Sequence, residues 1–395
     1  MGGCPLVTTV VSSMIADLHT HYPMHLIEQS TLDRMRRFRR SPSLDWFRVL
    51  ILRLANLIAN YEHGKPAVTI ENLRTGNVGV ALSVLYSPFS EMDLDKPYGA
   101  PPSPGYINEV INQLSMVERD IATRHAGQAT VARTQNDLQI ALAQGQVALV
   151  HCVEGGFHVG ATPAAVRDNV HLLARRGVAY ITLAHLFYRG VAANAPALPF
   201  MADSLYRLLF PQPNEPLSEL GKEMIRAMVD EHVLIDVTHM SDPATGATLA
   251  LLDELDPARQ VPVIASHAAC EFGNMEYNLS DRQVEAIARR RGVIGLIAGT
   301  HYMAPGTAKP QPRTFDDTMD VMFAHIDRIR QVTGSHDHAA LGSDLDGFIK
   351  PTLPGLGSPA GFAEVEQRLT RKYGATVAQQ ICSGNAMRVL GYWGR

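Results

Sequence analysis

Runs of consecutive apolar residues recur along the whole chain, and segments with helical periodicity separate them. The runs are nearly continuous rather than alternating, which is typical of parallel strands buried on both faces. The predicted strands are Val10–His19, Asn77–Tyr86, Val147–Glu154, Ala179–His185, Val233–His239, Val261–His267, Gly292–Gly299 and Ala339–Asp344. The predicted helices between them include Thr162–Arg176, Leu217–Glu231, Asp281–Arg291 and Asp316–Val332. This alternation predicts an α/β fold, a (β/α)8 TIM barrel.

The connections that follow the predicted strands are unequal in length. A Pro-rich segment, Ser87–Gly105, follows the second strand, and Leu186–Pro216 follows the fourth. Both leave the carboxyl ends of strands, the face on which barrel enzymes carry their active sites. Ser218 and Ser280, each followed by an acidic residue, predict helix N-caps. We therefore expect a single barrel domain over residues 1–395, with long βα-loop insertions that wall a substrate pocket.

Six of the eight predicted strands end in an imidazole or a carboxylate. These residues are His19 with His21, Glu154, His185, His239, His267 and Asp344. Any one of them alone is more often a satisfied buried histidine or a helix cap than a ligand. Together they project into one barrel mouth, where buried polar groups need partners that metal ions can supply. Such a cluster predicts a metal-dependent active site.

The types of ligand indicate the chemistry. Imidazole and carboxylate without thiolate favour Zn²⁺ or a similar divalent ion. A carboxylate between two sets of histidines can bridge two metal ions about 3.5–4 Å apart and supply a hydroxide that is nucleophilic at neutral pH. Asp344, on the last predicted strand, can take the proton of that hydroxide and pass it to a leaving group.

Composition narrows the class of protein. The chain carries 35 basic and 39 acidic residues, a net charge of −4, whereas a dedicated nucleic-acid binder shows a basic excess. No apolar run approaches the ~18 residues that a membrane helix needs. The first residues lack the basic segment of a secretory signal, and the four scattered cysteines favour free thiols in a reducing cytosol. We expect a cytoplasmic protein that binds a small molecule, and neither nucleic acid nor membrane.

The residues at the strand ends and their surroundings resemble the membrane (renal) dipeptidase family, binuclear zinc barrels of the amidohydrolase superfamily. The resemblance covers nearly the whole chain in matching order. Its motifs are DLHTH (17–21), VEGG (153–156), YITLAH (180–185), LSELGKEMIRAM followed by LIDVTHMS (217–241), ASH (265–267), NLSD (278–281), LGSDLDG (341–347) and SGNAMRVL (383–390). The LSELGK-to-THMS and GSDLDG blocks are the most specific, whereas HxH alone occurs in many unrelated hydrolases.

This resemblance implies a zinc-dependent dipeptidase or amidohydrolase that cleaves a C–N bond and works as a homodimer. The implied ligands are His19, His21 and Glu154 for one Zn²⁺, and Glu154, His239 and His267 for a second. Asp344 would serve as the acid/base and as a further contact of the first metal. His185 would bind the substrate and polarise the scissile carbonyl. The implied mechanism is attack of a metal-bridging hydroxide on the amide, with His185 stabilising the oxyanion and Asp344 protonating the departing amine.

Two positions depart from the family pattern. His21 replaces the usual aspartate of the first strand, which leaves the site about one charge unit more positive. Tyr277 stands where the family has an arginine before the residue equivalent to Asn278, and that arginine grips the free carboxylate of the substrate. Because a phenol cannot replace a bidentate Arg–carboxylate contact, we expect Tyr277 and Asn278 to bind a modified, cyclic or capped substrate. Alternatively, the alignment shifts locally and another arginine, such as Arg282, serves.

Two other classes of function stay open. DLHTH resembles the opening motif of metallo-phosphoesterases of the polymerase-and-histidinol-phosphatase type, although an early Thr-Asp-His motif is absent and strand ends carry few basic residues. A barrel that has become a non-catalytic interaction module is the other class, and the presence of every metal-position residue argues against it. The sequence assigns no role to His151, His158 or Cys152.

Overall fold

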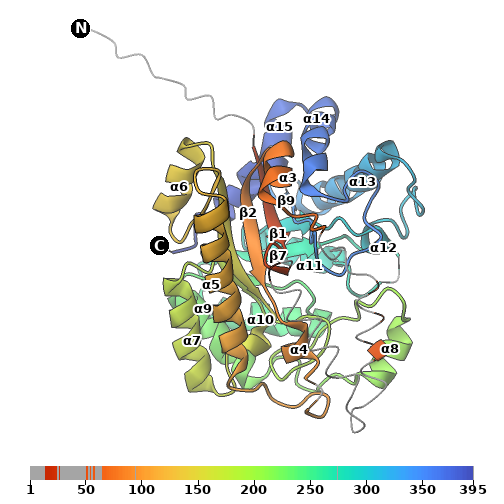
Figure 1. The fold of residues 1–395 in the computed structure, drawn as a ribbon. Coiled ribbons are helices and arrows are strands. Elements are labelled where there is room, and N and C mark those ends of the chain that lie inside the picture. The colour runs from red at the N-terminus through yellow and green to blue at the C-terminus, as the bar shows by residue number, and fades with distance from the viewer. Residues whose placement is uncertain are drawn as a thin grey trace.

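Parallel strands close into a barrel, and helices pack around it (Figure 1). The computed structural model describes residues 14–24, 26, 50, 51, 54, 57, 65–93, 95–273 and 275–394. The strands are β1 (Ile15–Thr20), β2 (Val78–Leu85), β3 (Ala129–Val131), β4 (Val147–Glu154), β5 (Tyr180–Thr182), β6 (Leu234–Asp236), β7 (Val263–Ala268), β8 (Ile294–Leu296) and β9 (Ala339–Leu341). Their order is β2-β1-β9-β8-β7-β6-β5-β4, and pairing of β2 with β4 closes the ring. The predicted TIM barrel is confirmed.

Helices connect the strands and form the outer layer (Figure 1). They are α3 (Ile70–Thr75), α4 (Pro88–Glu91), α5 (Tyr106–Arg124), α6 (Gln135–Ala143), α7 (Pro163–Arg175), α8 (Asp203–Leu209), α9 (Glu219–Asp230), α10 (Asp242–Leu255), α11 (Asp281–Arg289), α12 (Thr300–Met303), α13 (Phe315–Thr333), α14 (Phe362–Tyr373), α15 (Ala375–Gln379) and α16 (Asn385–Leu390). Short helical turns lie at η1 (Gly156–His158), η2 (Pro359–Gly361) and η3 (Gln380–Gly384). The four helices predicted above correspond to α7, α9, α11 and α13.

One short strand was not predicted. β3 pairs in parallel with Val147–Leu149 at the start of β4, on the edge opposite to β2, so it lies beside the barrel rather than in the ring. Its apolar stretch is too short to stand out from the loops around it. The first residues of the strand predicted over Val10–His19, residues 10–13, lie outside the described part of the chain.

Three of the strands that were predicted to end in a candidate site residue end earlier than predicted. The residues expected at their carboxyl ends, His185, His239 and Asp344, lie three positions beyond the last paired residues of β5, β6 and β9. His239 and Asp344 have positive φ angles of 66° and 58°, so the backbone has left the extended conformation there. The polar side chains therefore stand on the loops at the barrel mouth, the face on which such barrels build sites.

Both predicted N-caps are confirmed. The side chain of Ser218 accepts a hydrogen bond from the Gly221 backbone N–H at the start of α9. Ser280 begins α11 with a reciprocal capping box, in which its side chain accepts from the Gln283 N–H and Gln283 reaches back. These caps fix where each helix starts and hence the length of the loop before it.

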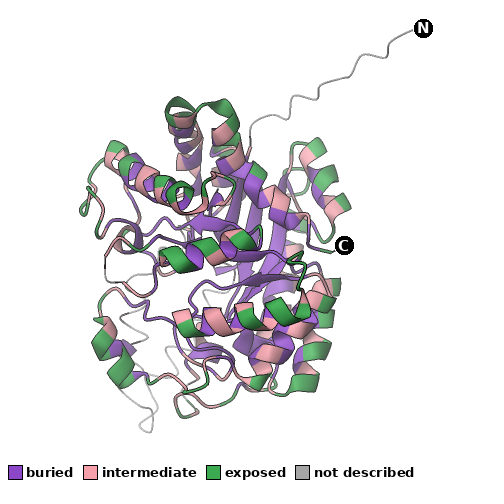
Figure 2. Cartoon of the chain, turned by 180° about the vertical axis from the view of Figure 1, so that it is seen from behind, coloured by how far each residue is buried: buried purple, intermediate pink, exposed green. Residues whose placement is uncertain are grey.

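The barrel strands are buried, whereas the outer faces of the helices are exposed (Figure 2). All eight residues of β4, for example, are buried. Long connections follow β2 and β5, and the second of these contains α8. None of the helices in the described part of the chain has the length and hydropathy to cross a lipid bilayer.

Candidate metal centre

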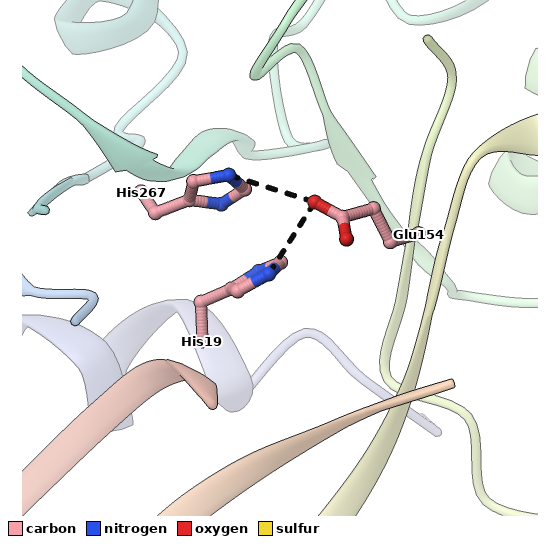
Figure 3. A group of neighbouring side chains, drawn as sticks. All are labelled: His19, Glu154 and His267. Atoms are coloured by element: carbon pink, nitrogen blue, oxygen red, sulfur yellow. Dashed lines mark ion pairs between the residues drawn. The ribbon is translucent and has the colours of Figure 1, made fainter. Parts of the chain in front are cut away.

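Glu154, the last residue of β4, is the point on which the strand-end histidines converge. Figure 3 shows the rings of His19 and His267 turned toward the same oxygen of its carboxylate. Four imidazole Nε2 atoms lie near Glu154 Oε1: those of His19 at 3.4 Å, His185 at 3.5 Å, His267 at 3.5 Å and His239 at 3.6 Å. Segments that are far apart in sequence thus place their imidazoles around one carboxylate.

His21 and Asp344 complete the cluster on the other carboxylate oxygen. His21 Nε2 lies 3.5 Å from Glu154 Oε2 and 2.9 Å from Asp344 Oδ1. Asp344 has a left-handed backbone conformation, and its backbone N–H donates to the His19 carbonyl oxygen of β1 at 2.9 Å. The glycine at 347 leaves room for it, because a Cβ there would lie 2.1 Å from Asp344 Oδ1.

The donor atoms fit divalent metal ions. Three groups within this cluster bring ligand atoms within 4.8 Å of one another: His19 with Glu154 and His267, His19 with His21 and Asp344, and Glu154 with His185 and His239. Both carboxylate oxygens of Glu154 are buried and lack a hydrogen-bond partner among the described residues. The Nε2 atoms of His239 and His267 face each other at 3.0 Å. Such unsatisfied buried acceptors need a cation.

Hydrogen bonds behind the rings favour Nε2 as the ligand atom of His19. The Tyr180 hydroxyl donates to the Leu18 carbonyl, so it accepts from His19 Nδ1, which lies 2.7 Å away. Ser266 likewise donates its hydroxyl to Asp236 and lies 3.0 Å from His267 Nδ1. With Nδ1 protonated in each ring, the Nε2 lone pair is free for a metal, the tautomer that metal-binding histidines adopt.

Electrostatics favour the charge states that metal binding needs at Glu154 and His267. Burial disfavours the Glu154 carboxylate, but the neighbouring histidines, His185 and His19 foremost, hold the pKa of Glu154 well below its usual range. Burial, together with the His19 ring, lowers the pKa of His267 well below its usual value. Burial opposes charge on His185 too, yet the carboxylates of Glu154 and Glu91 raise its pKa to about 9. Ligands must be deprotonated to bind a metal, and Glu154 and His267 meet this condition.

The sequence profile of the membrane dipeptidase family (peptidase family M19) matches residues 9–393. The protein is a member of the membrane dipeptidase family. This confirms the resemblance described above, and neither the family match nor the structural neighbours described below support the phosphoesterase alternative.

Curated relatives and solved structures agree with this membership. "Dipeptidase tcpJ" of Claviceps purpurea (strain 20.1) is 24% identical over 291 residues, which are 72% of this chain and 60% of that protein's length. An uncharacterized protein in the pqqA 5′ region of Klebsiella pneumoniae is 26% identical over 73% of this chain and 97% of its own. The dipeptidase AC, a metallo peptidase, superposes with a TM-score of 0.69 at 18% identity over 97% of this chain and 99% of its own. A metallo peptidase from Rhodobacter sphaeroides, solved with a phosphinate mimic of L-Ala-D-Ala, gives a TM-score of 0.66 at 18% identity over 96% and 99%. These structures share the fold.

Tyr277, which the sequence analysis aligned with a family arginine, is buried beside the candidate metal centre of this dipeptidase-family barrel. Its ring packs edge-on against His239, with 5.0 Å between centroids, and its hydroxyl donates to the backbone carbonyl of His267 at 2.9 Å. Asn278 donates its amide to the Tyr302 carbonyl at 2.9 Å. Arg282 is exposed on α11, and its guanidinium lies near Gly246 of α10 in the helical layer. The structure therefore does not bring Arg282 to the site.

Several residues that the sequence analysis did not single out support the site. Glu91 accepts a hydrogen bond from His185 Nδ1 at 2.8 Å. Asp236 accepts from Ser266, which contacts His19 and His267. A carboxylate inside an otherwise apolar strand run, as at Asp236, is a signal that the sequence does contain.

The structure also places the residues whose role the sequence left open. His158 accepts a hydrogen bond from the Ser87 N–H through Nε2 and bonds the Gly155 carbonyl through Nδ1, so it joins the loops after β2 and β4. Burial lowers its pKa to about 4. Burial raises the pKa of the Cys152 thiol well above its usual value, which makes it a packing residue rather than a nucleophile. His151 is fully buried on β4, and neither of its ring nitrogens has a hydrogen-bond partner among the described residues.

Proposed function

We propose that this member of the membrane dipeptidase family hydrolyses an amide or peptide bond with two divalent metal ions, most naturally Zn²⁺. The observation that carries the proposal is the buried carboxylate of Glu154, whose oxygens have no hydrogen-bond partner among the described residues and face five imidazoles. His19, His21 and Glu154 would hold one ion. Glu154, His239 and His267 would hold the other, with Glu154 shared.

The ions, when bound, would polarise the scissile carbonyl and lower the pKa of a water molecule. Side chains of the protein would transfer the protons and stabilise the developing charge. Asp344 would accept the proton of the attacking water and return it to the departing nitrogen, because its Oδ1 stands at the edge of the cluster, 2.9 Å from His21 Nε2. His185 would donate from Nε2 to the carbonyl oxygen and stabilise the charge that develops there.

We further propose that the end of the substrate near Tyr277 is uncharged. The rings of Tyr277, Tyr302 and His301 lie in series, with centroids 4.4 Å and 3.9 Å apart. The hydroxyls of Tyr277 and Tyr302 donate to backbone carbonyls, and burial lowers the pKa of His301 to about 4, so it is neutral. This series of rings therefore presents no positive charge to a free carboxylate. A lactam, a cyclic or capped amide, or an N-acyl compound suits it better.

Hydrolysis of L-alanyl-D-alanine and of its C-terminal amide tests both parts of the proposal. We expect the amide to be cleaved with the higher kcat/KM, and a chelator to abolish both reactions until Zn²⁺ is restored. Asp344→Asn is expected to keep its metal and lose turnover. Cleavage that survives chelation would overturn the metal-dependent reaction, whereas a clear preference for the free acid would overturn only the uncharged substrate end.

Three further statements stay predictions from the sequence. They are that residues 1–395 form one catalytic domain, that the protein works as a homodimer, and that it resides in the cytoplasm. Sedimentation velocity of the purified protein tests the second of them directly.

A further inference from the structure

Glu91 is a buried carboxylate in the loop that follows β2, at the end of α4. Its residue exposure is 1%, and it lies within hydrogen-bond distance of groups from two connections of the barrel. Oε1 accepts from the Phe187 backbone N–H at 2.7 Å. Oε2 accepts from the Tyr86 hydroxyl at 2.6 Å and from His185 Nδ1 at 2.8 Å. One carboxylate thus binds the loop after β2 to the loop after β5.

The backbone of Glu91 is fixed as firmly as its side chain. The guanidinium of Arg189, which is 3% exposed, donates from Nε to the Glu91 carbonyl oxygen at 2.8 Å. The ring of Tyr86 meets the ring of His185 edge-on, with 4.5 Å between centroids. A buried charge is costly unless it is paired and hydrogen-bonded, so a carboxylate at this position needs these partners. The same partners leave it little freedom to move.

The position of Glu91 determines which atom of His185 faces the cluster. Because Nδ1 is engaged by Glu91, the opposite atom, Nε2, points to the metal centre, 3.5 Å from Glu154 Oε1. The His239 ring packs edge-on against His185, at 4.5 Å between centroids, which restricts the ring from the other side. A carboxylate behind a catalytic imidazole is a general way to fix its tautomer and orientation.

We propose that Glu91 is a positioning residue, which holds the His185 ring so that Nε2 can donate to the carbonyl oxygen of the substrate. The inference rests on the proposed function of His185. Glu91 would act through His185, because its carboxylate bonds Tyr86, His185 and Phe187 and, among the described residues, none of the candidate metal ligands. Its removal should therefore lower kcat and leave the metal content and KM nearly unchanged.

A double-mutant cycle with the metal-loaded protein and L-alanyl-D-alanine amide as probe tests this inference. Glu91→Ala is expected to lower kcat about 10- to 100-fold, the range for residues that orient an active-site group. Adding Glu91→Ala to His185→Ala is expected to cause no further loss, because coupled residues are not additive. If Glu91→Ala does not fold, Glu91→Gln keeps the size and one acceptor oxygen and takes its place in the cycle.

Asp256→Asn is a matched control. The Asp256 carboxylate also accepts a backbone N–H, that of Val261 at 2.7 Å, and also contacts a basic side chain, that of Arg290 at 3.1 Å. Val261 precedes β7, so this carboxylate lies at the amino-terminal face, away from the site. Asp256→Asn is expected to lose stability and keep kcat.

A crystal structure of the Glu91 variant tests the positioning role independently of the proposed function. We expect the His185 ring to leave its position beside Glu154. A ring that stays in place, an unchanged kcat, or a loss that adds to that of His185→Ala would overturn the positioning role. If the wild-type protein fails to cleave the probe while the ring moves as expected, the proposed function fails and the positioning contact stands.

Discussion

Ser266 donates its hydroxyl to Asp236 at 2.6 Å, and the same oxygen lies 3.1 Å from Nδ1 of the candidate ligand His19. Asp236 is fully buried and accepts hydrogen bonds from groups on three strand ends. The donors are the hydroxyls of Thr182, Thr238 and Ser266 and the backbone N–H groups of Thr238 and Ser266. The Asp236 carboxylate thus fixes the residues beneath the candidate metal centre in position relative to one another.

Asp236→Asn should therefore lower both the free energy of unfolding and the affinity for metal. The amide would turn an NH₂ group toward donors, and an unsatisfied buried group costs about 1–3 kcal/mol. Because Ser266 would lose its acceptor, we expect metal affinity to fall about 10- to 100-fold. Urea unfolding and competition with a metal-binding dye measure the two effects. An Asp236→Asn protein with normal metal affinity would show that Ser266 does not depend on Asp236.

Gly347→Ala should displace the Asp344 carboxylate. A Cβ at 347 would lie 2.1 Å from Asp344 Oδ1, so the side chain has to shift. We expect kcat to fall about 100-fold, the order of magnitude that general acid–base catalysis contributes.

The matched control for Gly347→Ala is Gly246→Ala in α10. A Cβ at 246 meets nothing closer than the Arg282 guanidinium at 3.8 Å. This change should keep full activity and stabilise the helix by about 0.5–1 kcal/mol. A fully active Gly347→Ala protein would contradict the assignment of Asp344 as the acid/base.

His325 should make the protein lose stability as the pH falls. Its Nδ1 accepts from the Cys270 N–H and its Nε2 donates to the Met303 carbonyl, so the folded ring is neutral. Burial lowers its pKa from 6.5 to about 4. Because the folded-state pKa is depressed, the stability is present above pH about 6.5 and is lost as the pH falls toward about 4.

Urea unfolding of wild type and His325→Gln at pH 7 and pH 5 measures this effect. Glutamine can keep both hydrogen bonds and does not titrate. The drop in unfolding free energy between the two pH values should be about 2 kcal/mol smaller in the variant, since one pKa unit corresponds to about 1.4 kcal/mol. Equal drops in both proteins would show that His325 is not protonated on unfolding.

Tyr277→Phe should lower the free energy of unfolding and leave the substrate preference unchanged. The Tyr277 hydroxyl is engaged by the His267 carbonyl, so its loss removes an internal hydrogen bond worth about 1 kcal/mol. The ratio of kcat/KM for a dipeptide amide and the free dipeptide should stay unchanged. A shift of that ratio by tenfold or more would show that the hydroxyl contacts the substrate directly.

The sequence predicted the barrel because its strands are continuous apolar runs and because polar residues end six of them. It also predicted that His19, Glu154 and His267 belong together, since the carboxyl ends of barrel strands meet at one face. Glu91 could not be predicted in this way. It lies in an irregular loop, and its contact with His185 joins segments 94 positions apart that no periodicity relates.

The exact ends of the strands also could not be predicted from the sequence. His185, His239 and Asp344 follow β5, β6 and β9 by three residues, although the residues between each strand and its polar residue are all buried. Burial thus continues on the loops at the barrel mouth after strand pairing has stopped. Hydrophobicity along a sequence indicates which residues are buried. It does not indicate where the hydrogen-bonded pairing of a strand ends.

The metal content of the purified protein tests the central claim most directly. Elemental analysis of wild type and Glu154→Ala, each dialysed against trace Zn²⁺, is the measurement. We predict about two divalent ions per wild-type chain, and a loss of metal in the variant, because Glu154 faces both sets of histidines. A wild-type protein that holds no metal, or a Glu154→Ala protein that keeps its full complement, would contradict the account.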